Sequence, residues 1–493
     1  MRHVHALIAL LISLATPTTI FAASELPPDM TGKSFAWIIV AAFIIAYFLV
    51  VWGEKHKLKK SVPTLIGAGI IWIIVGIIYV AEGNPEHIAS MRAGFDESIV
   101  EIGQLTFFLI TAMTYVITMQ ERNVFQVIRY RFLRAGLSQR QIFWATGAAA
   151  FVLSPVLDNL TTALALVSVV LAVGTATGDR KFVTLSAINL VVAANAGGAY
   201  SPFGDITTLM VWQSGKVSFF EFFSIFIPSL VNWLVPALIM SFAVKAPEIV
   251  SFNRPVALKS GAWTVIGLFA LTLLMAVSAH LFLDLPPVIG MTTGLGLLLL
   301  FGCSFGECEP PQIEEPELPS GFTEEMVAYL REGFTPIQRA FNPMSSVRQL
   351  EWDTLLFFFG ILLAVSGVAQ MGYLVKLSAL AYETLGPTPT NIAIGVLSAV
   401  VDNIPTMSAV LNMDPDMVQG QWMLVTLTAG VGGSLLSIGS AAGVTLMNEA
   451  KMHDDDGRLV QVYTFMSHLR WSWAIALGYA ASIWVHTLLH TMH

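Results

Sequence analysis

Two short polar segments interrupt long apolar stretches of this chain, and each resembles the other. Residues 154–163 read Ser-Pro-Val-Leu-Asp-Asn-Leu-Thr-Thr-Ala, and residues 398–407 read Ser-Ala-Val-Val-Asp-Asn-Ile-Pro-Thr-Met. Ser, Asp, Asn and Thr recur in register. A single Asp-Asn pair often does no more than cap a helix, but two copies in register indicate a duplicated binding function. The aligned pairs are Asp158-Asn159 and Asp402-Asn403.

These repeated segments offer oxygen ligands. Carboxylate, amide and hydroxyl oxygens suit Na⁺, Li⁺ or a proton and match no soft-metal pattern. Asp158 and Asp402 occupy equivalent positions, so each half contributes one titratable carboxylate that could bind Na⁺. Deep in a membrane, desolvation favours the protonated form of a carboxylate. Na⁺ and H⁺ would then compete for the same groups, which is the minimal chemistry of an exchanger.

Each Asp-Asn pair is followed, about 30 to 40 residues later, by a Gly-Gly pair in the middle of another apolar segment. Residues 196–205 read Ala-Gly-Gly-Ala-Tyr-Ser-Pro-Phe-Gly-Asp, and residues 431–440 read Val-Gly-Gly-Ser-Leu-Leu-Ser-Ile-Gly-Ser. Glycine and proline at such depth predict broken helices. Asp205 either caps the second half-helix of its segment or binds the ion, with Thr207 and Thr208 in the first turn.

Four further polar residues in the apolar segments have alternative interpretations. Asn195 is close to the first break, whereas Asn189 favours a hydrogen bond between helices. Glu101, just inside the third apolar segment, is either a place where protons enter or an interfacial residue. His468, at a helix start, favours an interfacial position over a pH sensor.

The composition excludes a soluble enzyme, a disordered protein and a coiled coil. Of 493 residues, 55% are hydrophobic and 12% are charged, and the mean hydropathy is +0.71. A soluble domain has roughly twice that charged fraction. A polytopic membrane protein is therefore indicated. We expect the lipid bilayer, small cations and protons as partners, and the net charge of −8 gives no indication of a nucleic acid.

The apolar segments differ in length. A helix needs about 20 residues to cross the bilayer core, and three segments (141–174, 183–213 and 377–411) are too long for one clean span and contain Pro, Gly or Asp centrally. The full set is 34–53, 62–81, 99–119, 141–174, 183–213, 219–244, 261–283, 287–305, 353–374, 377–411, 421–447 and 468–490.

Loop charges predict the orientation. Residues 54–60 carry four Lys and residues 120–140 carry five Arg, which places both loops in the cytoplasm and the N-terminus in the periplasm. If residues 141–174 form a re-entrant hairpin with arms of about 15 residues, the basic residues that follow also stay cytoplasmic. Two full spans in this segment would also return the chain to the cytoplasm, although arms of this length look short for full spans.

The repeats then define the architecture. We predict an all-α polytopic membrane protein with two inverted repeats, each of five transmembrane spans plus a re-entrant hairpin, and with broken helices at the midplane. This plan is typical of secondary transporters. The predicted parts are a signal-peptide-like segment at 1–23, repeat 1 at 34–244, a cytoplasmic linker at 245–260, and repeat 2 at 261–490 with an acidic cytoplasmic insertion at 306–352.

Enzyme motifs are missing from the sequence. It contains no H-E-x-x-H, no G-x-S-x-G and no P-loop. Two cysteines are too few for a disulfide framework. We therefore expect no enzyme and no cofactor, and we expect the energy to come from ion gradients.

Three motifs carry a family resemblance: the hairpin motif 154–162, the break 204–208 and the second tip 398–405. The chain, from about residue 34 to 490, resembles the NhaD-type Na⁺/H⁺ antiporters of the ion transporter superfamily. The resemblance implies a bacterial inner-membrane antiporter that expels Na⁺ or Li⁺ for protons at alkaline pH and so serves pH homeostasis. The positions that it implicates are Asp158, Asn159, Asn195, Asp205, Thr207, Thr208, Ser398, Asp402, Asn403, Ser437 and Ser440.

The same superfamily includes sodium- or proton-coupled dicarboxylate and citrate carriers and arsenite pumps, which remain the alternative. Here an Asp precedes each Asn and no intramembrane Arg or Lys is available to neutralise an anion, so a cation is favoured. A cation channel is disfavoured, because two unequal repeats in one chain do not form the ring of identical groups that lines a selectivity filter. We expect alternating access, with the tips and broken spans moving against the other helices, through which two chains could form a homodimer.

Overall fold

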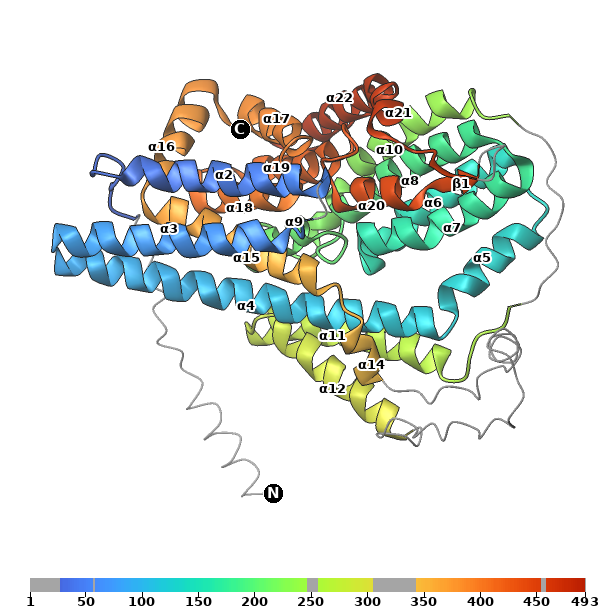
Figure 1. Ribbon diagram of the computed structural model, residues 1–493, viewed down its shortest axis with the longest axis horizontal. Coiled ribbons are helices and arrows are strands. Elements are labelled where there is room, and N and C mark those ends of the chain that lie inside the picture. The colour runs from blue at the N-terminus through green and yellow to red at the C-terminus, as the bar shows by residue number, and fades with distance from the viewer. Residues whose placement is uncertain (1–26, 56–57, 246–255, 305–342, 454–457, 493) are drawn as a thin grey trace, which may run out of the picture.

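The protein is an all-α polytopic membrane protein, apart from one small β-hairpin. Within the part of the chain that the structure describes, eight helices are long and apolar enough to cross a membrane. Figure 1 shows the long helices α2, α3 and α4 running lengthwise beside one another. The computed structural model describes residues 27–55, 58–245, 256–304, 343–453 and 458–492.

The first half contains two pairs of consecutive helices. The members of one pair are joined by a single residue, and those of the other pair are separated by a short break. Helices α6 and α7 are joined by one residue, and α8 and α9 are separated by residues 200–205. The elements are α2 (Ala36–Lys55), α3 (Ser61–Glu82), α4 (Pro85–Glu121), α5 (Val124–Arg134), α6 (Gln139–Leu157), α7 (Asn159–Thr177), α8 (Arg180–Ala199), α9 (Ile206–Gln213), the 3₁₀ turn η1 (Glu221–Ile225) and α10 (Phe226–Ser241).

The second half repeats this order. It begins with a helical pair, includes a helical hairpin, and ends with a broken helix and a final helix. The elements are α11 (Ala262–Leu283), α12 (Val288–Ser304), α14 (Pro343–Arg348), α15 (Trp352–Gln370), α16 (Tyr373–Ser378), the π-turn η2 (Ala379–Glu383), α17 (Pro387–Ser398), α18 (Asn403–Met413), α19 (Gln419–Gly432), α20 (Ala441–Glu449), strands β1 (Lys451–His453) and β2 (Leu459–Gln461), α21 (Phe465–Leu469) and α22 (Ser472–Leu489).

Corresponding elements of the two halves make corresponding contacts. Helix α6 packs along α8, as α17 packs along α19, and α2 packs on α3 as α11 does on α12. The two halves also contact each other, because α20 packs on α7 and α9 packs on α18. The duplication seen in the sequence is therefore a duplication of packing. That the repeats are inverted in a membrane stays a prediction.

Two predicted segments differ from the helices observed. The third span, predicted at 99–119, belongs to the 37-residue helix α4, because Asn84 accepts a hydrogen bond from the backbone N–H of Glu86 and Pro85 occupies the first helical position. The loop predicted at 120–140 contains the amphipathic helix α5, whose 11 residues include three Arg and are too short and too charged for a membrane span.

The arms of the first hairpin also differ from the expected 15 residues. Helices α6 and α7 have 19 residues each, whereas α17 has 12 and α18 has 11. At 1.5 Å per residue the first arms are about 28 Å long, so their length alone does not distinguish a re-entrant hairpin from two spans. Re-entry stays a prediction.

The centre of the molecule is formed by α8 and α19. Every residue of α19 from Gly420 to Gly432 is buried, as is nearly all of α8. Helices α6, α7, α10 and α20 pack around α8, and α17 and α22 pack on α19. In Figure 1, α11 and α12 lie along α4, on the side away from this centre.

Several predicted parts lie wholly or largely outside the described residues. These are the signal-peptide-like segment 1–23, much of the linker 245–260 and most of the acidic insertion 306–352. The described end of the insertion forms α14, which packs against α4 and α12.

Candidate ion-binding site

The two hairpin tips and the first break meet at the carboxylate of Asp205. The Nδ2 of Asn159 donates a hydrogen bond to Oδ2 of Asp205 at 3.2 Å, and the Nδ2 of Asn403 donates to the same oxygen at 2.7 Å. All three side chains are buried. The two asparagines that the repeat aligns therefore bind one atom, from α7 in one half and α18 in the other.

Asn195 extends this network to the second break. Its Oδ1 accepts a hydrogen bond from Nδ2 of Asn159 at 3.0 Å. Its own Nδ2 donates to the hydroxyls of Ser434, at 2.8 Å, and Ser440, at 3.1 Å. The predicted site residues Asn195 and Ser440 thus lie in one hydrogen-bond network with Asn159.

The backbone at both breaks places polar groups at a helix N-terminus. Asp205 and Ser440 both have extended backbone immediately before a helix. The Oγ1 of Thr208 donates to the carbonyl of Asp205 at 2.8 Å, and Ser440 Oγ accepts from the N–H of Gly443 at 3.3 Å. Thr208 therefore supports the start of α9, while the carboxylate of Asp205 remains turned to the asparagines.

The breaks depend on close backbone contacts between glycines. A methyl group added at Gly204 would lie 2.5 Å from the Cα of Gly198, and one added at Gly433 would lie 2.6 Å from the carbonyl oxygen of Gly439. No larger residue fits at these positions without moving the backbone. The paired glycines of the sequence motif are therefore explained by packing.

The serines that open the two hairpin motifs anchor each hairpin to its broken helix. The Oγ of Ser154 donates to the carbonyl of Ala194 at 2.6 Å, and the Oγ of Ser398 donates to the carbonyl of Ala429 at 2.8 Å. Ser398 is thus positioned to hold the tip beside the break. These contacts are equivalent in the two halves.

The tip aspartates Asp158 and Asp402 lie beside the site and form hydrogen bonds of their own. Asp158 has φ +64°, a left-handed backbone that is rare outside glycine, and its two carboxylate oxygens accept from the N–H (2.8 Å) and hydroxyl (2.9 Å) of Thr161. The N–H of Asp402 donates to the hydroxyl of Tyr47 at 3.0 Å. In this conformation Asp158 caps α7, and the prediction that Asp158 and Asp402 bind Na⁺ stays a prediction.

Two predicted ligands present unused oxygen atoms. Among the described residues, the hydroxyls of Thr207 and Ser437 are buried and have no hydrogen-bond partner. A buried hydroxyl without a partner is unfavourable unless a ligand engages it. Both hydroxyl oxygens are therefore available to a ligand or to an ordered water.

Carboxylates and helix N-termini bring opposite charges to the site. The N-termini of α7, α9, α18 and α20 all begin at site residues, and each helix N-terminus carries roughly half a positive charge. The carboxylates of Asp158 and Asp402 are close enough to Asp205 for their charges to act on it. If all three carboxylates are ionised, their charge exceeds the roughly two positive charges of the helix N-termini, and the site then attracts a cation.

Sequence reasoning missed two residues that contact the site. Ser434 directly follows the second Gly-Gly pair, and its place in that motif could have identified it. Tyr47 lies in the apolar helix α2, more than 350 residues from its partner Asp402 along the chain. No signal in the sequence distinguishes it from the other aromatic residues of the membrane helices.

The interfacial position predicted for His468 was wrong. Its side chain is fully buried, its Nε2 lies 2.9 Å from the carbonyl oxygen of Ser434 and its Nδ1 lies 2.7 Å from the hydroxyl of Tyr463. The reason is the short helix α21, which brings His468 against the second break before α22 begins. His468 therefore supports the segment that contacts Asn195.

Two other predictions have different outcomes. Asn189 forms the expected contacts between helices, because its Nδ2 donates to the carbonyl of Phe143 at 2.8 Å and its Oδ1 accepts from Nε1 of Trp233 at 2.9 Å. Glu101 lies on the exposed surface of α4. Its suggested role in proton access stays a prediction.

Nearly the whole chain is similar to known ion transporters. A family model described as the citrate transporter matches residues 5–430. The Na⁺/H⁺ antiporter NhaD of Alkalimonas amylolytica is 45% identical over 486 residues, which cover 97% of this chain and 96% of that protein. The chain belongs to the NhaD family of Na⁺/H⁺ antiporters.

Other NhaD family members and more distant proteins are similar over most of their length. NhaD of Halomonas elongata is 45% identical, with 97% of this chain and 94% of that protein covered. Sodium/proton antiporter 1 of Arabidopsis thaliana is 29% identical, with 92% and 72% covered. The resemblance to the NhaD family predicted from the hairpin and break motifs is confirmed.

Proposed function

We propose that this chain exchanges cytoplasmic Na⁺ or Li⁺ for external protons by alternating access. The observation that supports this most directly is the pair of asparagines, Asn159 and Asn403, on one carboxylate oxygen of Asp205. An ion at this point contacts both halves, so that a movement between them changes the side from which the ion is reached. The antiporter names of relatives at 45% identity support the same cargo.

Competition between the two ions follows from the charges. With all three carboxylates ionised, the site attracts Na⁺, and Asp158, Asp402, Thr207 and Ser437 offer further oxygen ligands. A proton on one carboxylate brings the sum of charges close to zero, since the helix N-termini contribute about two positive charges. Na⁺ then leaves, and deprotonation restores its site. More than one carboxylate permits more than one proton per Na⁺.

The elements divide into a moving part and a scaffold. The two hairpins and the two broken helices carry the site residues, and we propose that they move together against the remaining helices, through which two chains can pair. Transport needs no cofactor besides the exchanged ions. The loop charges support a multi-pass location in a bacterial inner membrane with the N-terminus outside.

An anion carrier is the alternative, because the matching family model is described as a citrate transporter. The first turns of α7, α9, α18 and α20, all within the described residues, contain no Lys or Arg. A citrate bound among three carboxylates would lack counter-charge, whereas a cation gains from each of them. The site therefore favours cation exchange.

Proton flux in everted vesicles that contain only this transporter tests the proposal. After a respiration-built gradient, Na⁺, Li⁺, K⁺, citrate and succinate are added in turn. We expect Na⁺ and Li⁺ to dissipate the gradient, and we expect Asp402→Asn and Asp158→Asn to lose or strongly weaken this response. Asp284→Asn, at an exposed helix end, is the matched control and should behave as the wild type.

The results of this experiment distinguish a cation/proton antiporter from an anion carrier. Normal exchange in Asp402→Asn would contradict the proposed role of the tip carboxylates. No response to any cation, together with uptake of a dicarboxylate, would assign the chain to the anion carriers. Thermal unfolding of each purified variant shows whether a lost activity reflects a lost fold.

A further inference from the structure

Helix α5 is an amphipathic helix between two membrane helices. Phe125 is buried, and Ile128 and Leu133 pack against the hydrophobic core. Arg129, Arg131 and Arg134 are exposed on the rest of the helix. The apolar face of α5 therefore packs on the protein, which leaves its basic side chains on the outside of the molecule, where lipid headgroups can reach them.

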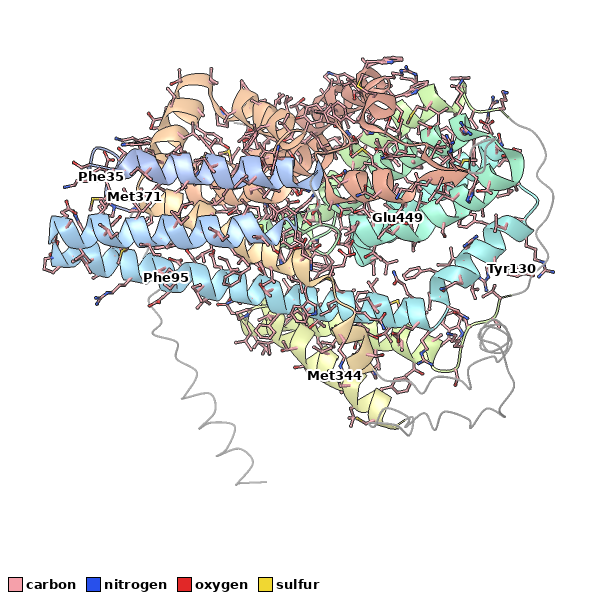
Figure 2. All side chains as sticks on the ribbon, viewed as in Figure 1. Phe35, Phe95, Tyr130, Met344, Met371 and Glu449 are labelled. Atoms are coloured by element: carbon pink, nitrogen blue, oxygen red, sulfur yellow. The ribbon has the colours of Figure 1, made fainter. Side chains whose placement is uncertain are left out.

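Helix α5 lies at one end of the molecule. Figure 2 shows Tyr130 on α5 at the end of the molecule opposite to Phe35, which immediately precedes α2. Helix α4 runs from the end that carries Phe35 toward α5, whereas α2 and α3 end near the middle of the molecule. The end that carries α5 is the one that the loop charges predict to be cytoplasmic.

A surface pocket of about 660 Å³ lies along α5. One wall is the helix face formed by Val127, Tyr130, Arg131 and Arg134, whose spacing of three, four and seven residues places them on one stripe. The opposite wall is the segment 256–258, which leads into α11. The pocket thus lies between a helix of the first half and the segment that begins the second.

Hydrogen bonds hold the opposite wall in place. The Nδ2 of Asn123, directly before α5, donates to the carbonyl of Ala257 at 3.3 Å. The N–H of Lys259 donates to the carbonyl of Arg122 at 3.2 Å. The second wall is therefore attached to the start of α5, and the pocket is a formed feature of the fold.

The lining defines the ligand chemistry. Two guanidinium groups face the pocket, and none of the described residues that line it is acidic. Arginine binds phosphate oxygens with two parallel donors. Val127, Val256 and Leu258 add an apolar surface that a free inorganic anion would not use, whereas the glycerol and acyl region of a lipid would. We infer that this pocket binds the phosphate headgroup of an anionic phospholipid in the leaflet next to α5.

Lipid titration by native mass spectrometry of the purified full-length chain tests this inference. The probes are cardiolipin, phosphatidylglycerol, phosphatidylcholine and inorganic phosphate. We expect cardiolipin and phosphatidylglycerol to bind the wild type more tightly than phosphatidylcholine. The double variant Arg131→Gln/Arg134→Gln should weaken that binding at least about tenfold, since each basic residue near an anionic surface contributes several-fold. Because both side chains are exposed, the fold should persist.

Arg129→Gln is the matched control, because Arg129 is exposed on the same helix but does not line the pocket. It should change binding less than about twofold. Equal losses in Arg129→Gln and the double variant would show a diffuse charge effect and overturn the inference, as would equal binding of phosphatidylcholine. Competition by inorganic phosphate at similar concentration would assign the pocket to a free anion instead. None of these readouts depends on ion exchange.

Discussion

The Nδ2 of Asn403 lies 2.7 Å from Oδ2 of Asp205, and this hydrogen bond joins the hairpin tip of the second half to the broken helix of the first. The two residues are 198 positions apart in the chain. Asn159 donates to the same oxygen from the first-half tip. Asp205 is therefore the point at which both repeats meet, and a movement that separates the tips must break one of these contacts.

Asn403→Ala should weaken cation binding while leaving the protein folded. The variant removes one hydrogen bond to a charged acceptor, a contribution of about 1.5–3 kcal/mol, which corresponds to roughly a ten- to hundredfold change. The measurement is the Na⁺ concentration for half-maximal exchange in everted vesicles. Asn189→Ala is the control, because the side chain of Asn189 forms hydrogen bonds with Phe143 and Trp233, outside the site. It should lower thermal stability without changing that concentration, and equal effects of the two variants would reduce Asn403 to a packing role.

Asp205→Asn should lose exchange without losing stability. The change keeps the size of the side chain but removes the charge at the centre of the network, so that Na⁺ affinity should fall at least about tenfold. Since the charges of Asp402 and Asp158 act on Asp205, removing its charge relieves repulsion, and the melting temperature should be unchanged or higher. Exchange assays and thermal unfolding of the same preparation check both parts. Wild-type Na⁺ affinity in this variant would show that Asp205 is only a helix cap.

Gly204→Ala should disrupt the first break. The added methyl group would lie 2.5 Å from the Cα of Gly198, a backbone atom that no rotamer change can move. We expect a loss of stability of about 1–3 kcal/mol together with loss of exchange. Gly76→Ala in α3, where no atom lies within 4 Å of the added group, is the control and should be neutral or stabilising. A Gly204→Ala variant as stable as the wild type would mean that the break tolerates a side chain.

The pH dependence of exchange should not depend on Asp29. The pKa of this exposed carboxyl, which precedes α2, is lowered from 3.8 to about 2 by hydrogen bonds from Thr31 and Lys376. A lowered pKa in the folded state means that the contribution to stability is present above the unfolded pKa and is lost as the pH falls through about 2. Asp29 therefore stays ionised, and its contribution to stability stays constant, at neutral and alkaline pH. Asp29→Asn should leave the pH profile of exchange unchanged between about pH 6 and 9, and a shifted profile would assign Asp29 a regulatory role.

The sequence alone predicted the local features of the candidate site. The aligned Asp-Asn pairs indicated two equivalent tips, and glycines beside Asp205 and Ser440 indicated the breaks, because these residues alter helices within a few positions of themselves. The family followed from the same motifs. Charged residues are rare in membrane segments, so an Asp in such a segment can be recognised from the sequence without knowing which residues lie near it in the fold.

Only the tertiary structure decided which of these groups meet. The sequence offered Asp158 and Asp402 as the central carboxylates, but the shared partner of the two asparagines is Asp205, and Tyr47 and His468 reach the surrounding segments from distant elements. Membrane helices are apolar on nearly every face, so hydrophobic periodicity does not indicate which face packs inward. The contact between Asn403 and Asp205 depends on how α18 packs on α9, and that packing is fixed by the fit of whole helices.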